Sequence, residues 1–152
     1  MIRSRLALAG ILAAILLASC GSRPDVTVSI ASGTVRMLES SVTEGTRCST
    51  FHGDGFVRDV PLTTVRTATP VTIEVEAGQT ATAIRGWIYD VDAPTPSGGP
   101  IEEFKLPGRN GAYEARSIVP ARTYEVVVNV AWSALITRGE VTHVFRVRVE
   151  PP

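Results

Sequence analysis

Residues 121–150, with the sequence ARTYEVVVNVAWSALITRGEVTHVFRVRVE, decide the fold class of this chain. Apolar side chains occupy alternate positions in two runs, from Tyr124 to Trp132 and from Val141 to Val149. A period of two places one set of side chains on a buried face and the other toward solvent. The sequence therefore predicts a long antiparallel hairpin. Its first strand should bury Tyr124, Val126, Val128, Val130 and Trp132 against the odd-numbered residues of the second.

The same alternation, together with the composition, extends this prediction to the whole domain. Residues 26–30 and 71–75 also alternate apolar and polar side chains. Residues 20–152 contain 19 valines, 7 isoleucines and 16 threonines, but only four leucines. β-Branched side chains are stiff at χ1 and pack well on a pleated surface, whereas helices favour leucine. We therefore expect an all-β fold.

A change of parity within residues 80–91, TATAIRGWIYDV, predicts an irregular strand. Ile84 is even-numbered, whereas Trp87, Tyr89 and Val91 are odd-numbered, and Gly86 stands at the change. An isolated glycine in a strand often marks a β-bulge that re-aims the side chains after it. We therefore predict a bulge at Gly86.

The spacing of turn residues and one tyrosine refine the fold class. Prolines at positions 61, 70, 94, 96, 100, 107 and 120 separate short strands. Tyr124 follows Pro120 at the start of its strand, a position that resembles that of the tyrosine opening the penultimate strand of immunoglobulin-like sandwiches. We expect an antiparallel immunoglobulin-like β-sandwich of about seven to nine strands in two sheets.

The first 19 residues have the pattern of a cleaved signal peptide. MIRSR supplies two positive charges, and the apolar run from Leu6 to Ala18 is 13 residues long. That run is shorter than the roughly 18 apolar residues that a spanning helix needs. Residues 1–19 are therefore expected to target the chain for secretion and then to be removed.

The residues around the expected cleavage point, Leu17-Ala18-Ser19-Cys20-Gly21, resemble the lipobox of bacterial lipoproteins. The resemblance implies cleavage before Cys20, diacylation of its sulfur and acylation of the new amino terminus. Residues 20–25 would then be the lipidated anchor and a short tether, and residues 26–152 a single domain. Gly21 and Ser22 replace the aspartate of the familiar inner-membrane retention signal. The implied location is the extracytoplasmic side of the cell envelope, on the outer membrane if the organism has one.

Charge and motifs limit the functions available to the mature domain. Removal of Arg3 and Arg5 leaves 13 basic against 15 acidic residues, so no basic excess is present for a nucleic-acid backbone. The sequence lacks Gly-x-Ser-x-Gly, Ser-x-x-Lys, His-Glu-x-x-His and P-loop motifs. We expect no catalytic activity and no cofactor.

A wider resemblance covers most of the mature chain. The lipobox, the early strand, the G-x-x-C motif ending at Cys48, the TYEVVVNVAW run and the closing FRVRV together resemble a group of small uncharacterised bacterial lipoproteins with a β-sandwich domain. That group often carries a second cysteine about ten residues after the first, where this chain has Phe56, Val57 and Arg58. The resemblance implies a fold and an anchor, but no known activity.

The stretch GTRCSTFHGDGF, residues 45–56, contains the first metal-site candidates, Cys48, His52 and Asp54. In a straight strand Cys48 and His52 would lie about 13 Å apart, too far to share an ion, so only a turn could bring them together. The sequence HGDG favours such a turn, and His143 would have to complete the site. An ordinary loop with a half-buried thiol is the simpler interpretation. Metal handling or thiol redox chemistry stays as the alternative function.

A second group of acidic residues suggests calcium. Asp90, Asp92, Glu102 and Glu103 flank the loop APTPSGGP, and hard cations prefer oxygen ligands. The Asp-x-Asp pattern is weak by itself, because acidic residues beside proline are ordinary turn formers. The EF-hand pattern is absent.

Two non-enzymatic functions follow from these features. The first is a membrane-anchored module that binds an envelope protein or glycan through loops at one end of the sandwich, in residues 93–100, 107–111 and 133–140. The second is an accessory lipoprotein that packs edge to edge in a complex. In that case residues 141–149 or 26–30 would form an exposed edge strand.

Overall fold

The computed structural model describes residues 23–31, 33–46, 50–54, 59–67, 70–93 and 99–152. These residues form eleven strands and no helix, which confirms the all-β prediction. The strands are β1 (Val26–Ile30), β2 (Gly33–Thr34), β3 (Leu38–Thr46), β4 (Thr50–Asp54), β5 (Leu62–Arg66), β6 (Val71–Ala77), β7 (Ala81–Asp90), β8 (Glu102–Pro107), β9 (Asn110–Ala115), β10 (Arg122–Ser133) and β11 (Thr137–Glu150). In the described part of the chain, no helix is long and apolar enough to cross a bilayer.

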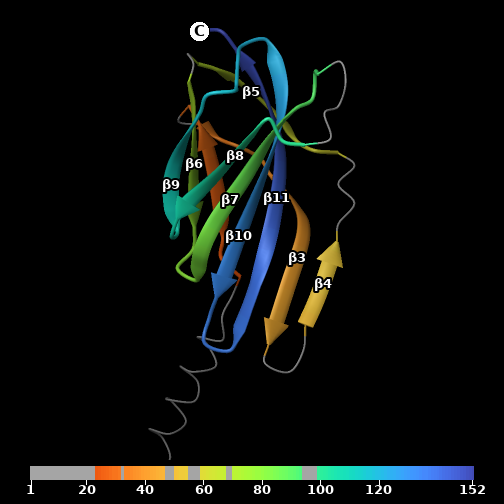
Figure 1. Ribbon diagram of the computed structural model, residues 1–152, viewed down its shortest axis with the longest axis vertical. Coiled ribbons are helices and arrows are strands. Elements are labelled where there is room, and N and C mark those ends of the chain that lie inside the picture. Colours follow the sequence, from red (N-terminus) through yellow and green to blue (C-terminus); the bar gives the residue numbers. More distant parts are fainter. Residues whose placement is uncertain (1–22, 32, 47–49, 55–58, 68–69, 94–98) are drawn as a thin grey trace, which may run out of the picture.

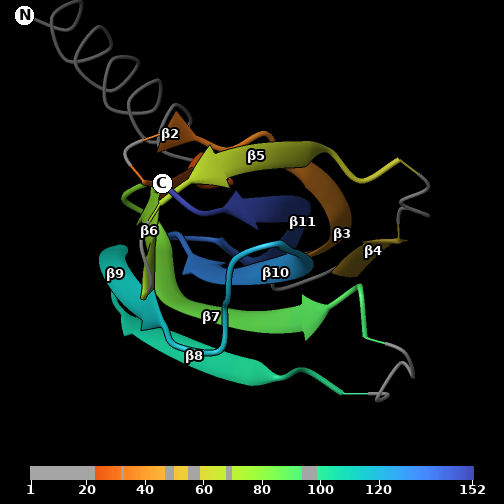
Figure 2. The same cartoon turned by 90° about the horizontal axis from the view of Figure 1, so that it is seen from above.

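The strands form two sheets, as predicted (Figures 1 and 2). The smaller sheet has the order β2-β1-β6-β9, and the larger has the order β4-β3-β11-β10-β7-β8. Strand β5 also joins the larger sheet, beside β11. The β5–β11 pair is parallel, and the other pairs among the described strands are antiparallel.

The eleven strands exceed the seven to nine expected, and β2, β3 and β4 are the strands that the sequence pattern does not indicate. β2 contains only two residues. β3, with the sequence LESSVTEGT, has a single apolar residue, Val42, between its ends and therefore no period-two signal. It forms a strand because β11 supplies a pairing edge, which is a tertiary effect.

Several features are compatible with an immunoglobulin-like sandwich. The smaller sheet, with β1, β6 and β9, faces the part of the larger sheet that contains β8, β7, β10 and β11. β8 and β9 lie side by side where the chain passes from one sheet to the other (Figure 2). The hydroxyl of Tyr124 accepts a hydrogen bond from the Val119 N–H at 2.9 Å and contacts the Val119 carbonyl at 3.3 Å. This matches the bond from a tyrosine at the start of the penultimate strand back to the backbone upstream.

The predicted hairpin is confirmed. β10 and β11 pair antiparallel from Arg122 opposite Val149 to Ser133 opposite Arg138. The five predicted residues of β10 are all buried, and so are four of the five odd-numbered residues from Val141 to Val149 of β11, the exception being the half-buried His143. The two strands therefore form the centre of the larger sheet.

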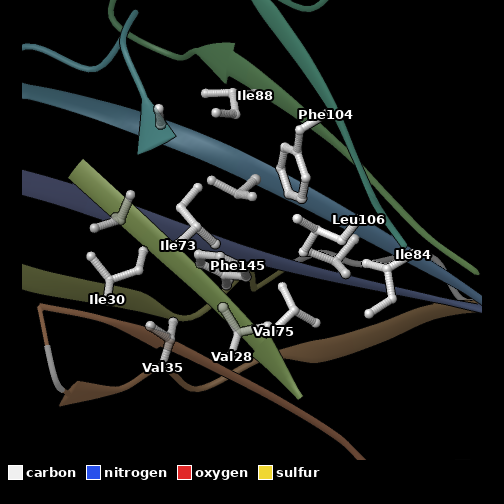
Figure 3. Packing of buried hydrophobic residues seen from close by; sticks show 14 of the residues in the cluster. Val28, Ile30, Val35, Ile73, Val75, Ile84, Ile88, Phe104, Leu106 and Phe145 are labelled. Carbon is white, nitrogen blue, oxygen red and sulfur yellow. The ribbon is translucent and has the colours of Figure 1, made fainter. Parts of the chain in front are cut away.

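One hydrophobic core fills the space between the sheets (Figure 3). Val28, Ile30 and Ile73 of the smaller sheet face Ile84 and Phe145 of the larger one, and all five are at most 1% exposed. Strand β6 shows the reason in its sequence, because VTIEVEA buries each apolar residue and exposes each polar residue between them.

The bulge predicted at Gly86 is wrong. Pairing runs through Gly86 without interruption, opposite Val128 on one side and Phe104 on the other. A Cβ atom at Gly86 would lie 2.0 Å from Cζ of Phe104, so glycine is present because that ring occupies the side-chain position. Trp87 and Tyr89 lie on the opposite face of β7, half-buried. The irregularity lies earlier in β7. Ala131 pairs with Ala83 and Trp132 with Ala81, so Thr82 between them has no partner in β10 and forms a bulge.

Of the two expected edge strands, β11 is not an edge and β1 is an edge over only part of its length. β11 is paired with β10 along one side, and along the other with β3 in its first part and β5 in its last part. β1 pairs with β6 along its whole length, but the two-residue β2 covers only Ser29 and Ile30 on its other side. The period-two pattern identifies a strand and its buried face, but it carries no information on neighbours, which are set by distant segments.

Candidate functional site: a groove at the end of the β10–β11 hairpin

Several chain segments meet at one end of the sandwich, where the β10–β11 hairpin extends past β6, β7 and β9 (Figure 1). The Ser133 N–H donates to the Thr80 carbonyl at 2.9 Å, which ties the hairpin to the turn before β7. The Ala134 N–H donates to the Thr137 carbonyl at 2.7 Å and closes the hairpin. Residues 107–111, which span the end of β8, the turn and the start of β9, lie at this same end, because Pro107 pairs with Ala83.

The third predicted loop, residues 93–100, lies elsewhere, and its residues 94–98 fall outside the described part of the chain. Asp90, at the end of β7 that leads into this loop, pairs with Tyr124, whereas Ala81 pairs with Trp132 at the other end of β10. The three loops therefore do not share one end of the sandwich. Residues 133–140 and 107–111 lie at one end, and the loop after β7 begins at the other.

A groove of about 470 Å³ opens beside the hairpin end. That volume is within the usual range for small-ligand sites. Its lining comes from four strands: Thr43 and Gly45 of β3, Thr82 of β7, Trp132 and Ser133 of β10, and Arg138, Gly139 and Glu140 of β11. A second hollow of about 220 Å³ shares Gly45, Ser133 and Arg138 and continues along the hairpin tip.

Gly139 allows these strands to approach one another closely. It lies directly opposite Trp132 in the ladder. A Cβ atom at position 139 would lie 2.1 Å from the Thr43 carbonyl oxygen and 3.0 Å from Cζ2 of Trp132. No side chain fits against the backbone at that distance, so glycine is needed for β3 to cross here beside the indole.

Trp132 has the most unusual environment in the groove. The residue is 2% exposed, and its Nε1 is buried without a hydrogen-bond partner among the described residues. Buried tryptophan N–H groups usually find an acceptor, and a buried donor left without one costs about 1–3 kcal/mol. An acceptor oxygen from a ligand would remove this cost, so the orphaned donor points to a binding role.

The β7 bulge places a hydroxyl in the same lining. Thr82, the residue left over in the pairing, donates its Oγ1 hydrogen to the Ala131 carbonyl at 3.1 Å. Bulges often re-aim a side chain next to a functional site. The hydroxyl oxygen keeps its acceptor capacity for a ligand.

Charged side chains of both signs complete the lining. Arg138 is exposed and makes no ion pair with a described residue. Glu140 is also exposed and accepts a hydrogen bond of 3.4 Å from Nδ2 of Asn129. The groove therefore offers donors and acceptors close together, as recognition of a neutral, hydroxyl-rich ligand requires.

The first metal-site prediction is only partly covered by the structure. Cys48 lies outside the described residues, as does the side chain of Asp54. His52 and Asp54 belong to strand β4, paired with Thr43 and Ser41, so His52, Gly53 and Asp54 are extended and do not form the expected turn. Nδ1 of His52 is 3.1 Å from Oγ1 of Thr43.

His143 does not join His52. Its strand position is opposite Glu39 and Val128, whereas the Thr43 that pairs with His52 is opposite Glu140, about 10 Å away along β11. Burial lowers the pKa of His143, which therefore favours the neutral ring. Among the described residues, no three His, Cys, Asp or Glu side chains lie close enough to hold a metal ion.

The acidic residues proposed for calcium are divided between two structural clusters. Asp90 accepts hydrogen bonds from the Arg122 guanidinium and from the Asp92 N–H, the latter at 3.0 Å. Asp92 accepts one from the Thr123 N–H at 2.7 Å. The hydrogen bond and charge of Asp90 raise the pKa of Arg122. Both carboxylates thus stabilise the junction of β7 and β10.

Glu102 belongs to the second cluster and links the two sheets. Its carboxylate accepts hydrogen bonds from the Tyr113 hydroxyl at 2.5 Å, from the Ser117 N–H at 2.8 Å, from the Ser117 hydroxyl and from the Arg116 N–H at 3.3 Å. Burial raises the pKa of Glu102, but these hydrogen bonds outweigh it and lower the pKa below 4.5. Glu103 is exposed and follows Glu102 on the alternate face of β8.

Trp132 was expected to be a core residue, and no sequence motif marks it as part of a site. Two local signals accompany it. Trp132 is the last buried residue of its strand before the hairpin turn, and Gly139 follows seven residues later. Neither separates a binding tryptophan from a packed one, because the missing hydrogen-bond partner is visible only when β3 and β7 are in place.

No protein-family model, curated protein or solved structure matches this chain in the comparisons made.

Proposed function

We propose that the protein is a non-catalytic binding module of the cell envelope, anchored to a membrane through lipid on Cys20. The ligand is an envelope component rich in hydroxyl groups, of which a glycan segment is the simplest. It binds in the groove lined by Trp132, Thr82, Arg138 and Glu140. The lipobox-like residues Leu17 to Cys20 support the anchor, and the groove supports the binding role.

The observation that carries this proposal is the buried, unpartnered Nε1 of Trp132. The ring is too buried for a sugar to stack on its face. Nε1 is itself buried, so the contact is a hydrogen bond to a ligand oxygen that forms when the groove lining shifts to expose the indole edge. Hydroxyl groups then use the remaining acceptors and donors of the lining. The volume of about 470 Å³ suits one or two sugar-sized units better than a broad protein interface.

The test is a titration followed by nuclear magnetic resonance. The chain has two tryptophans, so the spectrum of residues 21–152 shows two indole N–H signals, and Trp87→Phe assigns them. The probes are soluble oligosaccharide and glycopeptide fragments released from bacterial cell envelopes. We expect the Trp132 signal to shift and broaden while the Trp87 signal, from the opposite face of the sheet, stays in place.

Trp132→Phe is the matched variant, because it keeps an aromatic ring and removes the N–H donor. A lost hydrogen bond of this kind corresponds to about 1–3 kcal/mol, or roughly a tenfold to hundredfold weaker affinity. If no fragment moves the Trp132 signal, or if Trp132→Phe binds as the wild type does, the proposed binding role is wrong. Mass spectrometry of Cys20 in the protein from membranes tests the anchor separately.

A further inference from the structure

The amino-terminal segment enters the sandwich at the same end as the hairpin tip. The Gly78 N–H donates to the Asp25 carbonyl at 2.9 Å, and a Cβ atom at Gly78 would lie 3.3 Å from Cα of Pro24. Cys20 precedes Arg23 by three residues, which span at most about 11 Å. A lipid on Cys20 therefore holds this end of the domain close to the bilayer.

The hairpin tip at this end carries two adjacent exposed apolar side chains. Leu135 is 71% exposed, the highest value among the large apolar residues described as exposed, and Ile136 is 46% exposed. The hydrogen bond from Ser133 to Thr80 holds the base of the tip to the turn that follows Gly78. The tip and the attachment point of the tether are thus fixed to the same turn.

We propose that Leu135 and Ile136 insert into the interfacial region of the bilayer that holds the lipid on Cys20. The inference rests on the proposed lipid anchor and adds a second, non-covalent membrane contact. Arg138, which follows the tip and makes no ion pair with a described residue, lies where it can meet lipid phosphate. The tip is too small to anchor the protein alone, since even one acyl chain binds only marginally.

The consequence of two contacts is a fixed orientation. β10 contains 12 residues and spans about 40 Å. The residues that lead into its start at Arg122 therefore lie well away from the membrane. The groove beside Trp132 then opens near the membrane surface. The groove would therefore bind a ligand that lies close to the membrane surface rather than one far from it.

The experiment places an environment-sensitive fluorophore at the tip of the full lipidated protein. Leu135→Cys in a Cys48→Ser background supplies one labelling site, because the acylated sulfur of Cys20 cannot react. Val119→Cys is the matched control. Val119 is also an exposed apolar residue, with an exposed fraction of 46%, and it lies just before the start of β10, at the end of that strand far from the tip. Each protein is purified from membranes, checked for acylation of Cys20 by mass spectrometry and reconstituted into vesicles of zwitterionic and anionic phospholipid.

We expect a blue-shifted emission from position 135, protected from an aqueous quencher, and a solvent-like emission from position 119. Ile136→Ser should reduce both the shift and the protection at position 135. An acylated protein whose position 135 stays solvent-like overturns the insertion alone. A shift that appears without vesicles and grows with protein concentration means that a second copy covers the tip, which also overturns it. Absence of acyl groups on Cys20 overturns the proposed anchor and, with it, the membrane contact.

Discussion

At the scale of single residues, the structure gives polar side chains roles that their position in the sequence does not indicate. Glu102 resembles a surface carboxylate beside a proline-rich loop, yet it accepts four hydrogen bonds. Tyr113 stacks on Phe104 with ring centroids 4.7 Å apart and donates its hydroxyl hydrogen to Glu102. The hydrogen bond to Glu102 raises the pKa of Tyr113 to about 12.

Glu102→Gln should return the pKa of Tyr113 toward its ordinary value near 10, because an amide attracts the phenolic proton less than a carboxylate does. Ultraviolet absorbance of the phenolate during an alkaline titration measures this change. Because the folded pKa of Tyr113 is raised, its contribution to stability is present below pH 10 and is lost as the pH approaches 12.

The folded pKa of Glu102 is lowered, so its contribution has the opposite sign. It is present above about pH 4.5 and is lost as the pH falls through the folded value. Glu103→Gln, a neighbouring carboxylate on the other face of β8, is the control and should leave both dependences unchanged. An identical alkaline titration of Glu102→Gln and the wild type would refute the assigned role.

At the scale of elements, neighbours decide what a strand can do. β11 carries a long alternating run that suggested an exposed edge strand, but its central position means that β11 cannot be the edge in an edge-to-edge assembly. Thr142 pairs with Asn129 on one side and Ser41 on the other. The amide of Asn129 also donates to its hydroxyl at 3.0 Å.

Thr142→Pro should therefore prevent folding rather than block assembly. Proline in a strand paired on both sides removes a ladder hydrogen bond and clashes with the neighbouring strand. Thr142→Ser keeps the hydroxyl and should fold normally. Circular dichroism and the yield of monomeric protein measure the difference. A folded, monomeric Thr142→Pro variant would show that β11 is not paired as described.

At the scale of the whole molecule, one core joins the two sheets. The link is strengthened where the chain crosses from β8 to β9, because Glu102 of the larger sheet is bonded to Tyr113 of the smaller one. Neither sheet can bury its apolar face without the other. The groove at one end exists because this shared core holds β3, β7, β10 and β11 in place.

Unfolding should accordingly be a single cooperative transition. In urea, tryptophan fluorescence and far-ultraviolet circular dichroism should give the same midpoint. Phe145→Ala, at the centre of the core and 0% exposed, should cost about 3–5 kcal/mol. Leu62→Ala, at a residue that is 56% exposed, should change the free energy of unfolding by about 0.5 kcal/mol or less. Two separate transitions would mean that the sheets fold independently.

Local pattern by itself determined the all-β class, the β10–β11 hairpin, its buried face and the place of Tyr124. These features depend on side-chain period and composition, which act over a few neighbouring residues. Tertiary structure alone decided the central position of β11, the packing of Phe104 over Gly86 and the bulge at Thr82. It also decided the groove around Trp132, where Gly139 and Thr43 come together. Each of these depends on contacts between segments far apart in the chain, and a strand carries no local record of which neighbours it will meet.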